Sequence, residues 1–370
     1  MKHLLTALII FLAVAGFAQD LDQLLANGRE QAQKLEFDQA LATFTQAIKQ
    51  YPQESYPYYE RALIKILQED YYGAIGDLNF ALEYTPKMAV AFDKRGEAKY
   101  YLDDSFAAID DFDKALLIDP KLTAAYSNRA FAKFDLDDDE GAYFDFSKAI
   151  ELDATDADKY YNRGVVRAEL GEFVGAIDDF NRSISLDSLD PAVYNNRGLA
   201  QFAIGDLDTA ISDFTKAISL DSVDAIKYEN RALAKTGMLD FEGALEDYNK
   251  SVELYGEDPD TYNLRGVVLY NLKQYSDAIT DYDLAISIDP EEALYYDNRA
   301  AAKNDSEDYK GAIEDYTISI ILFPIDPETF YFRALAKFSN SNNFDGCFDL
   351  QIAADLGLAE AIDALKEKCK

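Results

Sequence analysis

The sequence predicts an all-α protein, an α-solenoid built from about ten tandem helix-turn-helix repeats. Its most regular feature is the motif Tyr-x-Asn-Arg-Gly/Ala, which returns every 34 residues with some variation at the asparagine. Around these motifs, two apolar patterns of helical spacing flank a polar turn, as at 160–170 and 173–186. Self-similarity at a fixed period of this kind is the signature of repeats that stack and bury their apolar faces on one another. The arginines of the motif are Arg61, Arg95, Arg129, Arg163, Arg197, Arg231, Arg265, Arg299 and Arg333.

The arginines define a repeat frame. Extended in both directions, it covers residues 21–360 without an insertion, and residues 361–370 then form the end of a C-terminal capping helix. The predicted repeats are 21–54, 55–88, 89–122, 123–156, 157–190, 191–224, 225–258, 259–292, 293–326 and 327–360.

Tiny residues recur at two positions of the frame. One follows the arginine as Gly or Ala, and the other lies on the second helix, with an aromatic residue four positions later in most repeats. Two helices pack at close range only where one side chain is very small, so both positions are expected to be helix contacts. The tiny residues of the second helix are Ala40, Ala74, Ala108, Ala142, Ala176, Ala210, Ala244, Ala278, Ala312 and Gly346.

In period, tiny positions, spaced aromatics and closing prolines such as Pro86 and Pro120, residues 21–360 resemble the tetratricopeptide repeat family. Within that family, the chain resembles the secreted or periplasmic bacterial proteins whose repeats carry Asn-Arg-Gly/Ala. The resemblance implies antiparallel helix pairs stacked into a right-handed superhelix, with the first helix of each pair lining a concave groove. The chain departs from the family pattern in one respect: arginine stands where a leucine usually packs.

Each motif arginine is followed, sixteen residues later, by an aspartate. In the first repeat both partners are absent, because Asn27 and Thr43 occupy the two positions. A buried arginine is costly unless a carboxylate meets it. We therefore expect structural Arg–Asp ion pairs between first and second helices, within a repeat or across to its neighbour. The aspartates are Asp77, Asp111, Asp145, Asp179, Asp213, Asp247, Asp281, Asp315 and Asp349.

A second basic row lies four residues after the arginines, on the same helix face. We expect its apolar stems to cover the seam between helices and its charged ends to lie at the surface. The alternative, a cationic track for acidic ligands, is disfavoured because each arginine already has an aspartate. The row is Lys65, Lys99, Lys133, Arg167, Lys235, Lys303 and Lys337.

The resemblance also implies which first-helix residues line the groove. These side chains are mostly aromatic and aliphatic, which suits an extended peptide or a partner helix. The position where some family members carry a lysine that clamps a carboxylate holds no lysine in nine repeats, so that activity is not expected. The residues there are Tyr59, Asp93, Ser127, Tyr161, Asn195, Glu229, Asn263, Asp297 and Tyr331. The predicted groove residues are Tyr59, Leu63, Ile66, Tyr100, Phe131, Phe134, Tyr161, Val165, Phe202, Leu233, Tyr270, Tyr331, Leu335 and Phe338.

The N-terminus has the pattern of a signal peptide at residues 1–18. Lys2 supplies the positive start, an apolar stretch runs from Leu4 to Phe17, and small residues precede Gln19 at a cleavage spacing. The stretch is too short to span a bilayer, and no later segment is long and apolar enough. Cleavage predicts a periplasmic or secreted protein with no membrane insertion. The alternative is retention of the segment as an N-terminal anchor.

Composition narrows the function further. The net charge of −34 disfavours nucleic acid and anionic lipid as partners. The only histidine, His3, lies in the predicted signal peptide, so His-dependent catalysis and His-ligated metals are excluded from the mature chain. The acidic run at 135–140 would need Glu where Phe146 stands to be a calcium loop, and is expected to be a solvated turn. We expect no catalytic residues, no cofactor and no metal.

The two cysteines, Cys347 and Cys369, both lie near the C-terminus. In an oxidising compartment the simplest reading is a disulfide that ties a last helix, Glu360 to Lys368, over the exposed end of the stack. Two free thiols or an intermolecular bridge are the alternatives.

These features together predict a non-enzymatic scaffold that binds a peptide or partner protein in its groove. A self-assembling protein or one that organises a cell-envelope complex is the first alternative. A carbohydrate-binding or hydrolytic protein that uses a carboxylate pair among its 69 acids is the second and less favoured one.

Overall fold

The computed structural model describes residues 21–369, and this part of the chain is built from helices with no strand. The predicted signal peptide, residues 1–18, lies outside the described residues. Within the described range, no helix is both long enough and apolar enough to cross a membrane. The chain divides into an N-terminal half that ends at Ser188 and a C-terminal half that begins at Leu189.

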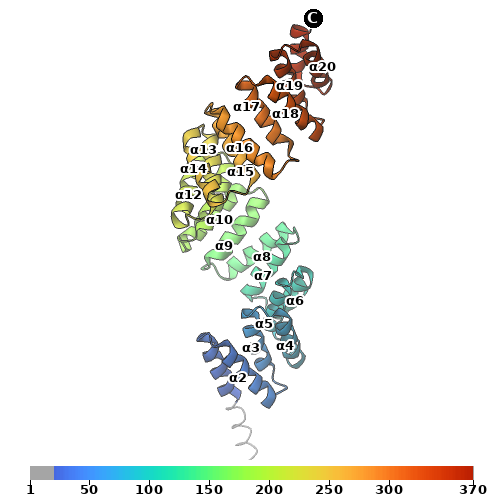
Figure 1. Ribbon diagram of the computed structural model, residues 1–370. Helices are drawn as coiled ribbons and strands as arrows, with labels where there is room; N and C mark the ends of the chain where they lie inside the picture. The colour runs from blue at the N-terminus through green and yellow to red at the C-terminus, as the bar shows by residue number, and fades with distance from the viewer. Residues whose placement is uncertain (1–20, 370) are drawn as a thin grey trace, which may run out of the picture. The chain divides into compact units, whose positions relative to one another are not determined.

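In the N-terminal half, residues 21–33 are helical and are followed by nine further helices (Figure 1). They are α2 (Phe37–Gln50), α3 (Ser55–Leu67), α4 (Tyr71–Tyr84), α5 (Ala89–Tyr100), α6 (Ser105–Ile118), α7 (Thr123–Phe134), α8 (Asp139–Leu152), α9 (Ala157–Glu169) and α10 (Phe173–Leu186).

The described part of the C-terminal half holds eleven helices. They are α11 (Pro191–Ala203), α12 (Leu207–Leu220), α13 (Ala225–Gly237), α14 (Phe241–Leu254), α15 (Pro259–Asn271), α16 (Tyr275–Ile288), α17 (Ala293–Asp305), α18 (Tyr309–Leu322), α19 (Pro327–Ser339), α20 (Asn343–Asp355) and α21 (Ala359–Lys368).

Helix packing follows the order of the chain within each half. An odd-numbered helix, the first of a repeat, packs on the even-numbered second helix that follows it, and the second packs on the first helix of the next repeat (Figure 1). First helices of neighbouring repeats also touch, as do α3 with α5 and α15 with α17. Three kinds of contact between neighbours therefore recur, and each repeat is stabilised mainly by the repeats beside it.

The turn inside each repeat has one conformation. The second or third residue after the first helix adopts a left-handed backbone, with φ between 59° and 83°, at ten positions spaced 34 apart. Gly171 and Gly205 take this conformation at no steric cost, whereas the other repeats place residues such as Glu69 and Leu239 there. The next residue caps the second helix in most repeats: Asp70, for example, accepts a hydrogen bond from the Gly73 amide at 3.0 Å.

Capping explains part of the acidic composition. In the acidic run at 135–140, Asp138 accepts the Gly141 amide at the start of α8, and Asp137 holds the left-handed turn position. The run is thus a helix-capping turn. No group of acids, cysteines or histidines among residues 21–369 has an arrangement that would hold a metal ion.

Tiny residues set the distance between paired helices. An added Cβ at Gly96, Gly164 or Gly198 would lie 2.7 Å from the ring of a phenylalanine on the second helix. The tiny alanines of the second helix, such as Ala74 and Ala108, are fully buried. The core is therefore a sequence of small clusters in which buried alanines pack around larger rings or aliphatic side chains.

Candidate functional site

The structure places every motif arginine beside the aspartate sixteen residues later, on the second helix of the same repeat. In each pair, Nε donates to Oδ2 at 2.7–2.9 Å and Nη2 to Oδ1 at 2.6–2.7 Å. The nine aspartates are at most 4% exposed. This two-bond geometry is the strong form of a charge-assisted contact. We call the nine pairs the ion-pair ladder.

The arginines also reach the preceding repeat. Nη1 of Arg95 donates to Asn79 Oδ1 at 2.7 Å, sixteen residues earlier on the preceding second helix. This contact was not predicted, although a polar residue stands two positions after each aspartate and could have indicated it. Acceptors at this position include Thr45, Asn79, Asp113, Ser147, Thr215, Asn249, Asp283 and Thr317.

An aromatic ring supports each guanidinium from its own helix. The ring three residues before the arginine lies 5.3–6.0 Å from the guanidinium carbon in all nine repeats. A cation over the face of an aromatic ring is attracted by the ring's quadrupole. Each arginine is therefore fixed by a carboxylate and a ring, which explains why its planar group occupies a leucine position.

The second basic row does not have its charged ends at the surface, and that expectation is wrong. Six lysines of the row place Nζ 2.7–2.8 Å from Oδ2 of the same aspartate that binds the arginine, and Arg167 does so with Nη1 at 3.1 Å. Several also donate to a backbone carbonyl, as Lys65 does to Gly73. A carboxylate can accept several donors, so one buried aspartate binds two cations at once.

The effect of two bound cations on a buried carboxyl is seen in the pKa of Asp111. Burial alone would raise the pKa of this carboxyl, but its hydrogen bonds to Arg95 and Lys99 hold the pKa below its usual range. Two repeats lack the second cation, because Gln201 and Leu269 occupy its position. Within the described residues, Gln201 Oε1 is one of the few buried side-chain atoms without a hydrogen-bond partner.

The predicted groove residues are mainly half-buried, and most contact the core of their own repeat. Phe131 meets Phe146 edge to face at 5.2 Å between ring centres, and Tyr161 lies 6.1 Å from Phe180. Tyr59, Ile66, Phe134, Phe202, Tyr331 and Phe338 likewise pack beside core clusters of their half. Leu233 is 38% exposed. Leu63 and Val165 are half-buried.

Four of the predicted residues line pockets. Tyr100 and Phe131 line a pocket of about 220 Å³ in the N-terminal half. In that pocket Asn128 Nδ2 donates to Asp93 Oδ1 at 3.0 Å, one repeat earlier. Burial raises the pKa of Asp93 to about 6. An equivalent contact joins two asparagines in the C-terminal half, where Asn298 Nδ2 donates to Asn263 Oδ1 at 2.8 Å.

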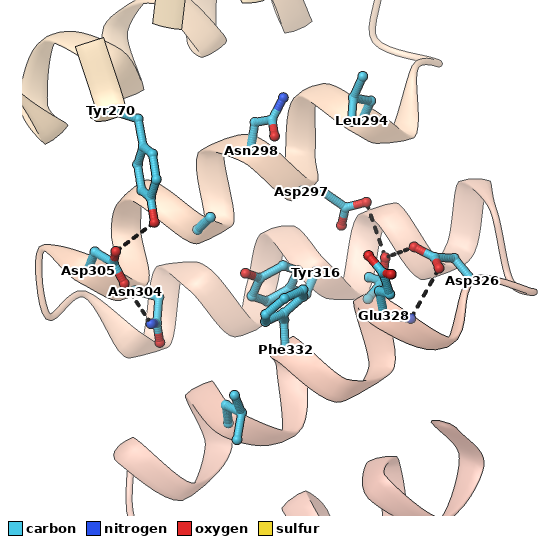
Figure 2. Close-up of a pocket in the computed structure, with 13 residues that line it drawn as sticks. Tyr270, Leu294, Asp297, Asn298, Asn304, Asp305, Tyr316, Asp326, Glu328 and Phe332 are labelled. Carbon is cyan, nitrogen blue, oxygen red and sulfur yellow. Dashed lines mark hydrogen bonds between the residues drawn. The ribbon is translucent and has the colours of Figure 1, made fainter. Parts of the chain in front are cut away.

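Tyr270 and Leu335 line a larger pocket, of about 490 Å³, in the C-terminal half. It extends across the first helices α15, α17 and α19 and down to Tyr316 on α18 (Figure 2). Sequence reasoning missed most of its wall, because the 34-residue register, which includes Asp297 and Asn298, does not show that these polar residues line a pocket. The lining residues are Tyr270, Leu294, Asp297, Asn298, Ala301, Asn304, Asp305, Tyr316, Asp326, Glu328, Thr329, Phe332 and Leu335.

The C-terminal end of the chain is closed by a covalent bond. Cys347 on α20 and Cys369 just after α21 form a disulfide with a Cα–Cα distance of 5.7 Å. Helix α21 packs on α20 with Ala361 and Ala364, which are buried. The last helix thus covers apolar surface of α20, including Leu350 and Ala353.

Comparison with known proteins agrees with this geometry. Models of the tetratricopeptide repeat match residues 28–54, 191–224 and 259–292. The chain contains tetratricopeptide repeats. The second and third matches have the same bounds as two repeats of the frame set by the arginines.

Solved tetratricopeptide repeat structures share the fold. The C-terminal part of a repeat-containing protein from Cytophaga hutchinsonii is 20% identical, with a TM-score of 0.55, and the alignment covers 64% of this chain and 98% of that one. A repeat protein from Parabacteroides merdae is 14% identical, with a TM-score of 0.51 over 67% and 99% of the two chains.

The structure of pilF from Pseudomonas aeruginosa is 23% identical, with a TM-score of 0.50 over 58% of this chain and 97% of that one. A comparison with curated proteins found no match. At these identities the likenesses establish the fold class, an all-α tetratricopeptide repeat solenoid, and nothing about the partner.

Proposed function

We propose that this protein is a non-enzymatic scaffold that binds a peptide or partner protein along its first helices. The observation that carries the proposal is the larger pocket, which is formed by three successive first helices. It combines apolar walls with unsatisfied polar groups, which is the composition of a ligand site.

The ion-pair ladder supports the same proposal by its rigidity. At least eight of the nine arginines contact both their own second helix and the preceding repeat, which holds the first helices in place before any partner arrives. A preformed surface loses little side-chain entropy on binding, which favours affinity. The ladder itself offers no binding track, because its cations are already engaged by buried aspartates.

A site-specific photocrosslinker tests which surface binds. Placed at Leu335 or Tyr100, on first helices, it should capture a partner in the native cell. The matched controls are Ile321 and Leu117, exposed positions on second helices (74% and 84%). Capture only from the controls would refute the first-helix surface. Capture of nothing but further copies of this chain would instead establish self-assembly.

We further propose that the mature protein is periplasmic or secreted. The signal-peptide pattern at residues 1–18 suggests it, and the Cys347–Cys369 bridge supports it, because disulfides persist in oxidising compartments. Cell fractionation with N-terminal sequencing tests the proposal. The expected first residue is Gln19, and a cytoplasmic protein with an intact N-terminus would refute it.

A further inference from the structure

The larger pocket lacks hydrogen-bond donors for two of its own acceptors. Among the described residues, only five buried side-chain atoms have no hydrogen-bond partner, and two of them, Asp297 Oδ1 and Asn304 Oδ1, belong to this pocket. Both are oxygens. The orientation of Asn304 is fixed because its Nδ2 donates to the Asp305 carboxylate at 3.2 Å, so its oxygen remains as the acceptor.

The other oxygen of Asp297 is only weakly engaged. Oδ2 accepts a bond from the Thr329 hydroxyl at 3.1 Å, and that hydroxyl also contacts Asp326 at 2.7 Å (Figure 2). A hydroxyl has one proton, so it serves one of the two carboxylates at a time. Ser319 is the other hydroxyl that hydrogen-bonds Asp297, and Oδ1 of this carboxylate still has no hydrogen-bond partner.

The pocket is also strongly acidic with no counter-charge. Asp297, Asp305, Asp326 and Glu328 line it, and none of its thirteen lining residues is Lys or Arg. The cations of the adjoining helices are engaged elsewhere: Arg299 and Lys303 by Asp315, and Arg333 by Asp349. A pocket lined by carboxylates without a neighbouring cation attracts a cation.

Aromatic rings form the remaining wall. Tyr316 and Phe332 stack with 6.4 Å between ring centres and an angle of 18°, and Tyr270 closes one end by donating to Asp305 at 2.7 Å (Figure 2). Flat rings beside carboxylates suit a planar cation, because a guanidinium can stack on a ring face while it donates sideways.

The two acceptors without partners are seven residues apart on α17, which is about 10 Å along the helix axis. One small amine cannot reach both. An extended peptide can, with a side chain at Asp297 and a backbone N–H at Asn304.

We propose that this pocket receives an arginine side chain of the bound partner, with the guanidinium at Asp297 and the adjoining peptide backbone at Asn304. The inference rests on the proposed function, because it names the chemistry recognised by one site of that peptide-binding surface. Arginine is favoured over lysine because its planar fork supplies several donors at once and stacks on rings.

A randomised ten-residue peptide display library, selected against the full chain, tests the inference. The wild-type chain should select peptides with arginine enriched at one fixed position. The Asp297→Asn variant should lose that enrichment and keep the preferences at other positions. The control variant, Asp277→Asn, removes an equal charge from an exposed site on α16 and should select as the wild type does.

One selected peptide is then measured by fluorescence polarisation. Replacing its arginine with citrulline, which has the same shape and no charge, should weaken binding to the wild type by about tenfold or more. The same replacement should change binding to Asp297→Asn by less than about threefold, and a melting curve shows whether that variant is folded.

The outcomes separate the two proposals. Selection of peptides without an enriched basic residue would overturn the arginine site and leave the scaffold intact. Failure to select any peptide would count against peptide binding itself. If free arginine bound at the pocket as tightly as the selected peptide, the ligand would be a small molecule, which would overturn the partner assignment.

Discussion

The ion-pair ladder predicts that two neighbouring repeats respond differently to the same pair of substitutions. In one repeat Asp247 binds both Arg231 and Lys235. In the next, Asp281 binds Arg265, and Leu269 stands where the second cation would be. The side chains of Arg231, Lys235 and Arg265 are each 17% exposed. The two repeats are therefore closely matched except for one lysine.

Removal of the aspartate alone should be costly in both repeats. Asp281→Ala leaves the Arg265 guanidinium largely buried without its carboxylate, and loss of one partner of a buried pair costs about 3–5 kcal/mol. Asp247→Ala leaves two cations side by side and should cost at least as much. The Asn249 contact and the Tyr262 ring do not neutralise the Arg265 charge that remains.

A second substitution should rescue only one of them fully. Arg265→Leu added to Asp281→Ala removes the unpaired charge and restores an apolar contact, so stability should return to within about 1 kcal/mol of wild type. Arg231→Leu added to Asp247→Ala leaves Lys235, so about 1–2 kcal/mol should remain lost. Adding Lys235→Leu to that variant should recover the difference.

Hydrogen exchange of α13–α16, with urea unfolding of each variant, measures the effect. Local exchange is needed because an array of repeats can open repeat by repeat, and a single midpoint would average over them. Equal recovery in both repeats would refute the role assigned to Lys235. No recovery in the Arg265 variant would refute the pairing itself.

Three further predictions follow from individual groups. Gln201→Lys should stabilise the chain by about 1 kcal/mol, because the ammonium would reach Asp213 and remove the unsatisfied Gln201 oxygen; a lower urea midpoint would contradict this. Burial raises the pKa of Asp297 to about 6, above its value in the unfolded chain. The folded chain then binds a proton first, so this group adds stability as pH falls from about 6 to about 4. Asp297→Asn should abolish that part of the pH dependence, and unchanged differences between urea midpoints at pH 7 and pH 5 would contradict the reasoning. Reducing the Cys347–Cys369 bridge, which spans 22 residues, should destabilise the end of the chain by about 2–4 kcal/mol. Hydrogen exchange in α21 should accelerate, with Cys369→Ser as the matched variant, and unchanged protection would show that packing alone holds the helix.

The pocket illustrates what sequence reasoning could not reach. Tyr270 and Leu335 were placed on the partner-facing surface because the repeat register carries them there. Asp297 occupies the register position of the family's clamp lysine and Asn304 belongs to no predicted set, but spacing marked neither as a pocket residue. They matter because their Oδ1 atoms have no hydrogen-bond donor. The absence of a donor can be seen only when the positions of all neighbouring atoms are known.

The sequence by itself determined the repeat, its period, the helix pairs and the partners of the motif arginines. These follow from spacing, because a fixed period places equivalent residues in equivalent surroundings. Only the tertiary structure decided where the charged ends of the second basic row lie. Sequence spacing gives the helix face that carries a side chain, but it does not show how deeply the groups around that face are buried. One aspartate proved able to accept both cations. That distinction depends on the packing of two helices around a single carboxylate, and it makes the ladder a structural support whose cations are engaged by buried aspartates.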